Sequence, residues 1–124
     1  MLIRFAVFES DNDSGHSAGA LVAAHTLRDE GDLTVSEHRE LRIALKWFNE
    51  NLPVPETLND IEHRRAISWF KPEAEEAIKK MWLLKNILEQ HGIYIKVLRT
   101  EEPGTVLHDD SWQVIAKPHK GQRF

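Results

Sequence analysis

One histidine and two carboxylates stand next to each other near the end of the chain, at His108, Asp109 and Asp110. An imidazole beside a carboxylate can take up and return a proton near neutral pH, which is the chemistry of general acid–base catalysis. A distant histidine, His63 or His119, would have to meet this cluster in space. The cluster suggests a small hydrolase or nuclease as one hypothesis, with ordinary turn and surface residues as the alternative.

A serine near the amino terminus offers a different chemistry. The segment Gly15-His16-Ser17-Ala18-Gly19 matches G-x-S-x-G, the turn that exposes the nucleophilic serine of α/β hydrolases. The first expected strand ends near Glu9 instead of running into this motif, and 124 residues are too few for that fold. Capping of the following helix by Asp13 or Ser14 accounts for the same segment without catalysis.

Acidic residues alternate after the first expected strand, at Glu9, Asp11 and Asp13, and His16 follows them. Carboxylate oxygens are the ligands that Ca²⁺ and Mg²⁺ prefer, so these four residues form a candidate cation site. The spacing departs from a calcium loop, because Ser14 stands where the loop needs glycine. A solvated acidic loop is the alternative. Since the chain has no Cys and none of its seven His are spaced as H-x-x-x-H, we expect no cofactor.

Local signals predict the elements that position these groups. Thr34 and Glu37 form a capping box ahead of an apolar helical stripe, Pro72 suits the first turn of a helix, and His91-Gly92 suits its end. Alternating apolar residues predict strands. The expected strands are 2–9, 66–70, 93–98, 105–107 and 112–116, and the expected helices are 18–30, 35–50 and 72–91.

The order β-α-α-β-α-β-β-β predicts an α/β (α+β) fold in one domain spanning residues 1–124. We expect a two-layer sandwich in which three helices cover one face of a mixed sheet of about five strands. Period-two alternation then directs one set of side chains at the helices: Ile3, Phe5, Val7, Ile67, Trp69, Ile95, Val97, Trp112 and Val114.

The opposite sheet face would stay uncovered and carry large apolar groups among basic ones. An apolar patch on a soluble protein marks a contact surface, so we expect a non-catalytic binding module that forms a homodimer or binds another protein. The same mixture of aromatic and basic residues is the alternative signature of a single-stranded nucleic-acid binder. The predicted interface residues are Phe8, Phe70, Tyr94, Lys96, Leu98 and Ile115.

Composition bears on these alternatives. The net charge is −4, which argues against nucleic acid as the partner, because nucleic-acid-binding domains are usually basic. Residues 1–62 hold 12 acidic and 5 basic side chains, whereas residues 63–124 hold 8 acidic and 11 basic ones. No apolar run reaches the roughly 20 residues of a membrane helix, and no signal peptide is evident, so we expect a soluble cytoplasmic protein.

The carboxy-terminal half also shows a family resemblance. It is carried by residues 65–71 (RAISWFK), His91-Gly92-Ile93, Pro103-Gly104, and Asp110 with residues 113–116 (QVIA). These segments resemble a family of small bacterial proteins of uncharacterised activity over about residues 65–118. The resemblance implies a bacterial cytosolic protein and supplies no catalytic residues.

Overall fold

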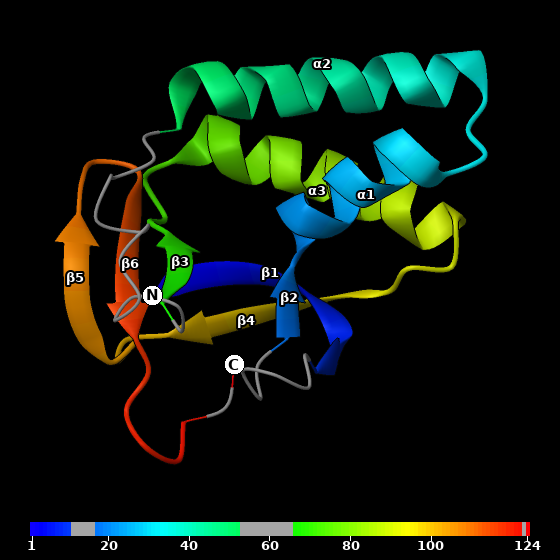
Figure 1. The fold of residues 1–124 in the computed structure, drawn as a ribbon. Coiled ribbons are helices and arrows are strands. Elements are labelled where there is room, and N and C mark those ends of the chain that lie inside the picture. Colours follow the sequence, from blue (N-terminus) through cyan, green and yellow to red (C-terminus); the bar gives the residue numbers. More distant parts are fainter. Residues whose placement is uncertain (11–16, 53–65, 123) are drawn as a thin grey trace.

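The computed structural model describes residues 1–10, 17–52, 66–122 and 124, and it has an α+β fold (Figure 1). Within these residues, no helix is both long and apolar enough to cross a membrane. The strands are β1 (Leu2–Ser10), β2 (Ser17–Gly19), β3 (Ile67–Phe70), β4 (Ile95–Thr100), β5 (Thr105–Asp109) and β6 (Gln113–Lys117). The helices are α1 (Ala20–Glu30), α2 (Val35–Asn51) and α3 (Glu75–Gln90).

The three predicted helices are present; α2 starts where it was predicted to start, and α1 and α3 start later. The capping box forms as expected: the Thr34 hydroxyl accepts from the Glu37 backbone N–H, and the Glu37 carboxylate accepts from the Thr34 N–H, both at 3.1 Å. Helix α3 begins at Glu75, three residues after Pro72, because Pro72 and Glu73 form a turn ahead of it. Helix α1 begins at Ala20, because Ser17–Gly19 pairs with β1 as a short strand that the sequence did not predict.

The sheet is antiparallel, which corrects the prediction of a mixed sheet. Every pairing among the described strands is antiparallel, in the order β2-β1-β3-β6-β5, with β4 on the other edge of β1. Helix α3 connects β3 to β4, and these two strands run in the same direction. They are not neighbours, because β1 lies between them and pairs with both, so this crossover creates no parallel pair.

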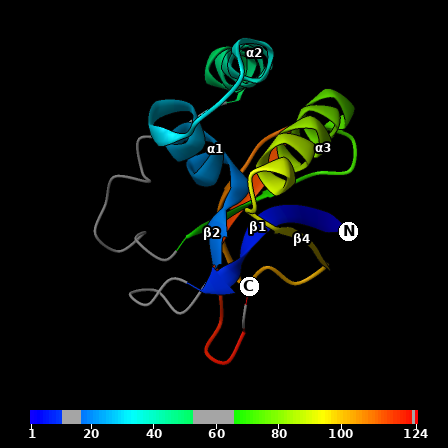
Figure 2. The same cartoon turned by 90° about the vertical axis from the view of Figure 1, so that its right-hand side faces the viewer.

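The helices lie on one side of the sheet at two different depths. Figure 2 shows α1 and α3 next to the strands, with α2 above the groove between them. Helix α2 reaches the sheet through aromatic residues near its end, where the ring centroid of Trp47 lies 5.7 Å from that of Trp112. Phe48 approaches Phe70 in the same region, at 6.1 Å. Most of α2 therefore packs on helices instead of on the sheet.

The faces of β1 and β4 are as predicted, whereas those of β3 and β6 are inverted. Phe70 lies opposite Ile3 in the ladder and belongs to the core beneath the helices. Because adjacent residues in a strand point to opposite faces, Trp69 and Ile67 are on the side away from the helices. The same parity places Gln113 and Ile115 of β6 on the helix side, and Val114 on the far side.

The far face is covered at its centre, so the prediction of an uncovered face is wrong there. Trp69 and Ala116 are fully buried, and the Phe124 ring stands edge-on to Trp69 with centroids 4.7 Å apart. The Arg4 guanidinium donates a hydrogen bond to the main-chain oxygen of Phe124. Residues after β6 thus supply apolar cover that the sequence pattern did not reveal.

Candidate functional site

The predicted acid–base cluster lies at the tight connection between β5 and β6. Asp110 holds this turn: its Oδ1 accepts hydrogen bonds from the backbone N–H groups of Trp112 (2.7 Å) and Gln113 (2.9 Å). The Asp110 N–H in turn donates to the Gln113 carbonyl at 3.0 Å. A short side chain that accepts from backbone two and three residues ahead is the usual way an aspartate stabilises a turn.

His108 and Asp110 are brought together as the acid–base hypothesis requires. The His108 Nε2 lies 2.7 Å from Asp110 Oδ2, with both side chains mostly buried. Desolvation alone would raise the pKa of Asp110, but hydrogen bonds from His108, Trp112 and Gln113 outweigh it and hold that pKa below its usual value. Asp110 is therefore a carboxylate at neutral pH that orients the imidazole.

Asp109 points to a different partner. Its Oδ1 lies 2.5 Å from the Nζ of Lys71, a residue between β3 and α3. The Lys71 N–H also donates to the Trp112 carbonyl at 2.9 Å. The two aspartates therefore serve separate contacts: one ties the turn to His108, and the other ties it to the start of the helical layer.

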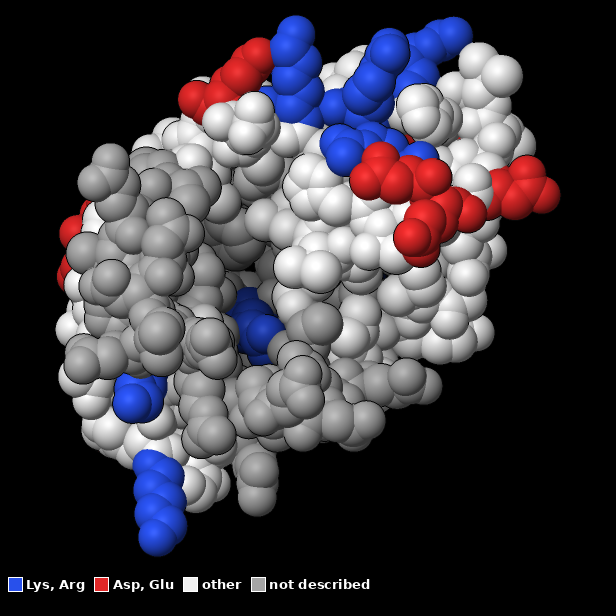
Figure 3. All heavy atoms as spheres, viewed as in Figure 1, with Lys and Arg blue, Asp and Glu red and all other residues white. Residues whose placement is uncertain are grey.

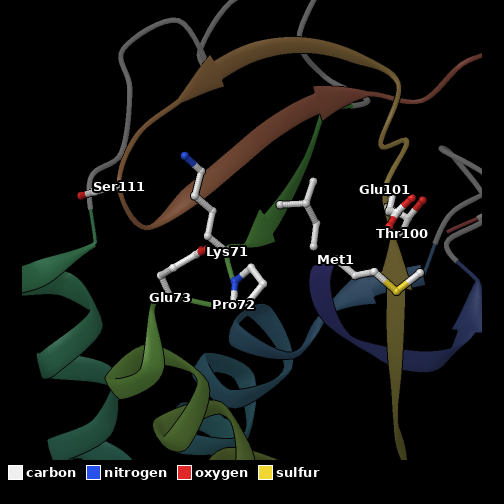
Figure 4. Close-up of a pocket in the computed structure, with 8 residues that line it drawn as sticks. Met1, Lys71, Pro72, Glu73, Thr100, Glu101 and Ser111 are labelled. Carbon is white, nitrogen blue, oxygen red and sulfur yellow. The ribbon is translucent and has the colours of Figure 1, made fainter.

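An open cavity of about 580 Å³ lies beside this turn (Figure 4). Lys71, Glu73, Glu101 and Ser111 supply its polar lining, together with Met1, Leu2, Pro72 and Thr100. Ser111 and Glu101 lie at opposite ends of the view, and the Lys71 side chain extends between them. His108, Asp109 and Asp110 are absent from the described lining, so the cluster and the cavity do not form one catalytic arrangement.

The remaining chemical candidates are only partly described. His63, Asp11, Asp13 and His16 lie outside the described residues. Glu9 and Ser17 are at the ends of β1 and β2, and their side chains also fall outside the description. Within the parts that the structure describes, no group of three or more His, Cys, Asp or Glu is arranged to hold a metal ion.

The predicted interface residues divide into two groups. Phe8 and Tyr94 are strongly exposed, at 64% and 63%, and Lys96 and Leu98 are half-buried. Phe70 and Ile115 are only 6% and 1% exposed, because the inverted faces of β3 and β6 turn them toward the helices. They cannot belong to an exposed contact surface, which corrects that part of the prediction.

The nucleic-acid alternative loses residues in the same way. Burial removes Phe70 as a stacking platform, and Arg4 is buried as well. On the face seen in Figure 3, acidic and basic side chains are mixed over the helices instead of forming a basic patch. A basic groove with several exposed aromatic residues is what single-strand binding requires.

Sequence reasoning missed a partly buried polar link between β3 and β6. Gln113 is almost fully buried, and its Oε1 accepts a hydrogen bond from the Ser68 hydroxyl at 2.6 Å. Its Nε2 lies 3.5 Å from Asp110 Oδ2, so the link continues to the turn. The alternation that directs Trp112 and Val114 at the helices puts Gln113 on the opposite face, where an exposed glutamine would need no partner.

Comparisons of the chain with protein-family models, with curated proteins and with solved structures found no match. The resemblance over residues 65–118 therefore stays a prediction, and the function has to be argued from the geometry.

Proposed function

We propose that the protein is a non-catalytic binding module that associates with a second copy of itself through an aromatic patch. The patch consists of Phe8 and Tyr94, flanked by Lys96 and Leu98 of β4. The observation that carries the proposal is the exposure of two neighbouring aromatic rings, 64% for Phe8 and 63% for Tyr94. The Phe8 N–H donates to the Tyr94 carbonyl at 3.2 Å, so the two residues are held side by side.

The shape of the patch supports contact with an identical surface. Val7, Gly92 and Ile93 join the two aromatic residues in lining a groove of about 270 Å³. In a two-fold dimer each copy contributes the same surface, so an aromatic ring of one copy can fill the groove of the other. Two such rings bury on the order of 150–250 Å² each, which favours a weak dimer over an obligate one.

The position of β4 at the sheet edge explains why the dimer would form through side chains and not through strand pairing. Among the described strands, β4 pairs only with β1, so its other edge has no strand partner. Lys96 and Arg99 lie on this edge strand, and charged residues there oppose direct pairing with another strand. Association through Phe8 and Tyr94 avoids that repulsion.

The hydrolase or nuclease hypothesis has weaker support. Asp110 is engaged by two backbone N–H groups and His108, Asp109 is engaged by Lys71, and none of the three lines a described cavity. A catalytic pair needs a concave site in which substrate can reach it. The arrangement is fully accounted for by turn stabilisation.

Light scattering over a range of protein concentrations tests the proposal. We expect the wild-type mass to rise toward that of a dimer, and Phe8→Asp and Tyr94→Asp to remain monomers with unchanged circular dichroism. Ile43→Asp is the matched control, because Ile43 is a similarly exposed apolar residue (59%) on α2. A wild-type protein that stays monomeric at hundreds of micromolar, or equal dissociation by Ile43→Asp, would contradict the proposal.

A further inference from the structure

An aromatic contact on the far face of the sheet joins β3 to the segment that follows β6. The ring of Phe124 stands edge-on to that of Trp69, with centroids 4.7 Å apart and ring planes at 87°. Edge-to-face packing is a favourable arrangement of two aromatic rings. Trp69 is fully buried and belongs to β3, so Phe124 is seated on a residue of the sheet itself.

A second contact holds the main chain of the same residue. The Arg4 guanidinium, on β1, donates a hydrogen bond to the main-chain oxygen of Phe124. Arg4 is 8% exposed, and desolvation lowers its pKa to about 10, so it donates as a cation at neutral pH. The sheet therefore contacts the ring and the main chain of Phe124 at once, as peptide-binding proteins contact a residue of a bound peptide.

The chain reaches this site through a turn that follows β6 (Figure 1). The Gln122 N–H donates to the His119 carbonyl at 3.0 Å, and the His119 N–H donates to the Gln122 side-chain oxygen at 2.6 Å. Gly121 has a φ of 93°, which glycine adopts readily. Gln122 Nε2 also donates to the Glu102 carbonyl at 2.8 Å, between β4 and β5. The turn is thus tied to one loop, and Phe124, beyond it, is tied to the sheet.

One polar group at this site is left unsatisfied. The Nε1 of Trp69 is buried, and it has no hydrogen-bond partner in the part of the chain that the structure describes. The Phe124 ring that packs on Trp69 offers no oxygen or nitrogen acceptor. A buried donor without an acceptor costs free energy, and undocking that admits water to the indole removes this cost. Docking of Phe124 is therefore weaker than its contacts alone would make it.

We propose that Phe124 occupies, within its own chain, a docking site for an aromatic residue of a partner chain. The partner is a peptide segment that places an aromatic ring on Trp69 and directs a main-chain oxygen at Arg4, in place of the ring and oxygen of Phe124. Docked Phe124 acts as an autoinhibitory contact that this segment displaces. The inference is independent of the proposed dimer, because Phe8 and Tyr94 take no part in the contacts of Phe124 described above.

The tether between Phe124 and the sheet determines how strongly a partner must bind. A group held close to its site by a short tether has an effective concentration on the order of millimolar. A peptide supplied in trans has to compete with this concentration in the wild-type protein. It meets no such competition in a variant that lacks the Phe124 ring, so the variant should bind the peptide more tightly.

Peptide titration of Phe124→Ala and of the wild-type protein tests the proposal. The probe is a synthetic peptide with the sequence of residues 118–124, and the matched probe has alanine in place of its phenylalanine. We expect Phe124→Ala to bind the phenylalanine peptide about tenfold or more tightly than the wild type does, and neither protein to bind the alanine peptide. The NMR signal of the Trp69 indole N–H reports occupation of the site.

Several outcomes would overturn the proposal: no saturable binding to Phe124→Ala, equal affinity of the two proteins, equal binding of the two peptides, or shifts at Phe8 and Tyr94 instead of at Trp69.

A second variant serves if Phe124→Ala does not fold. Gln122→Ala keeps the Phe124 ring but removes the side-chain hydrogen bonds that Gln122 makes with His119 and Glu102. We expect the Trp69 indole N–H to exchange with solvent faster in this variant than in the wild type. Lys120→Ala, at an exposed position of the same turn, is the matched control and should leave the exchange unchanged. Exchange that Gln122→Ala leaves unchanged, or that Lys120→Ala accelerates equally, would overturn the proposal.

Discussion

Ile3 of β1 lies directly opposite Phe70 of β3, and this is the one residue pair at which the two strands meet in the described sheet. The pair sets the parity of β3, and through β3 that of β6. It places Phe70 and Ile115 on the helix side of the sheet and leaves Trp69 for the far side. The register therefore places Phe70 and Trp69, neighbours in the chain, on opposite faces of the sheet.

The register predicts different consequences for two phenylalanines that the sequence assigned to one surface. Phe70→Ala should lower the free energy of unfolding by about 3–5 kcal/mol, because it leaves a cavity in the core. Phe8→Ala should change it by less than about 0.5 kcal/mol at concentrations where the protein is monomeric, because Phe8 is exposed. Urea unfolding followed by circular dichroism measures both. Similar losses for the two variants would contradict the assigned faces.

Two glycines with positive φ provide a second comparison. At Gly104 φ is 115°, and an added Cβ would lie 2.1 Å from the Lys117 carbonyl oxygen, whereas at Gly92 φ is 81° and no atom lies within 4 Å. Gly92→Ala should therefore lower the free energy of unfolding by about 1–2 kcal/mol, the cost of placing alanine in a left-handed conformation. Gly104→Ala should lower the free energy of unfolding clearly more, because the main chain at Lys117 would also have to move. Thermal unfolding of both variants tests this, and equal losses would refute it.

The capping box of α2 should contribute measurably to stability. Thr34→Ala removes the hydroxyl that accepts from the Glu37 N–H, and we expect the free energy of unfolding to fall by about 1 kcal/mol. Ser36→Ala, in the same exposed turn, serves as the control and should have a smaller effect. Chemical denaturation of the two variants and the wild type gives the free energies of unfolding to be compared. A loss for Ser36→Ala as large as that for Thr34→Ala would count against the cap.

Asp110 should make part of the stability dependent on pH. Its pKa is lower in the folded protein than in the unfolded chain, so the charged carboxylate stabilises the fold. That contribution is fully present above the unfolded pKa, whose reference value is 3.8, and it is lost as the pH falls through the lower folded pKa. Asp110→Asn should therefore flatten the loss of stability in acid.

Unfolding by urea at a series of pH values measures this effect. Glu101→Gln removes an exposed carboxylate after β4 and should leave the acid branch of the curve as in the wild type. If Asp110→Asn loses stability in acid as steeply as the wild type, the turn does not depend on the charge of Asp110.

Local chemistry predicted some features of this molecule well. The Thr34 and Glu37 side chains cap α2 using only residues of their own turn, so the sequence contains all the information needed. The clustering of His108 with Asp110 is predictable for the same reason, because only Asp109 separates them in the chain. That Asp110 also accepts from two backbone N–H groups is a common property of turn aspartates, and it could have been anticipated.

Features set by distant contacts could not be predicted in this way. Strand β3 has large apolar residues on both faces, Ile67 and Trp69 on one and Phe70 on the other, so hydrophobicity does not select its register. Strand β2 consists of small residues without strand preference and depends on its pairing with β1. Arg4 and Trp69 both contact Phe124, to which no periodic pattern connects them.

The insertion of β1 between β3 and β4 has a consequence for the order of folding. One edge of β1 is completed by β4, far along the chain, where Leu2 pairs with Thr100; the other edge is shared by β3, at Ile3 and Phe70, and by the nearby β2. Closing such long loops is entropically costly, and proteins dominated by distant contacts fold slowly. We therefore expect α1 and α2 and the local pairing of β1 with β2 to form early, and the pairing of β1 with β4 to form only after most of the chain has been synthesised.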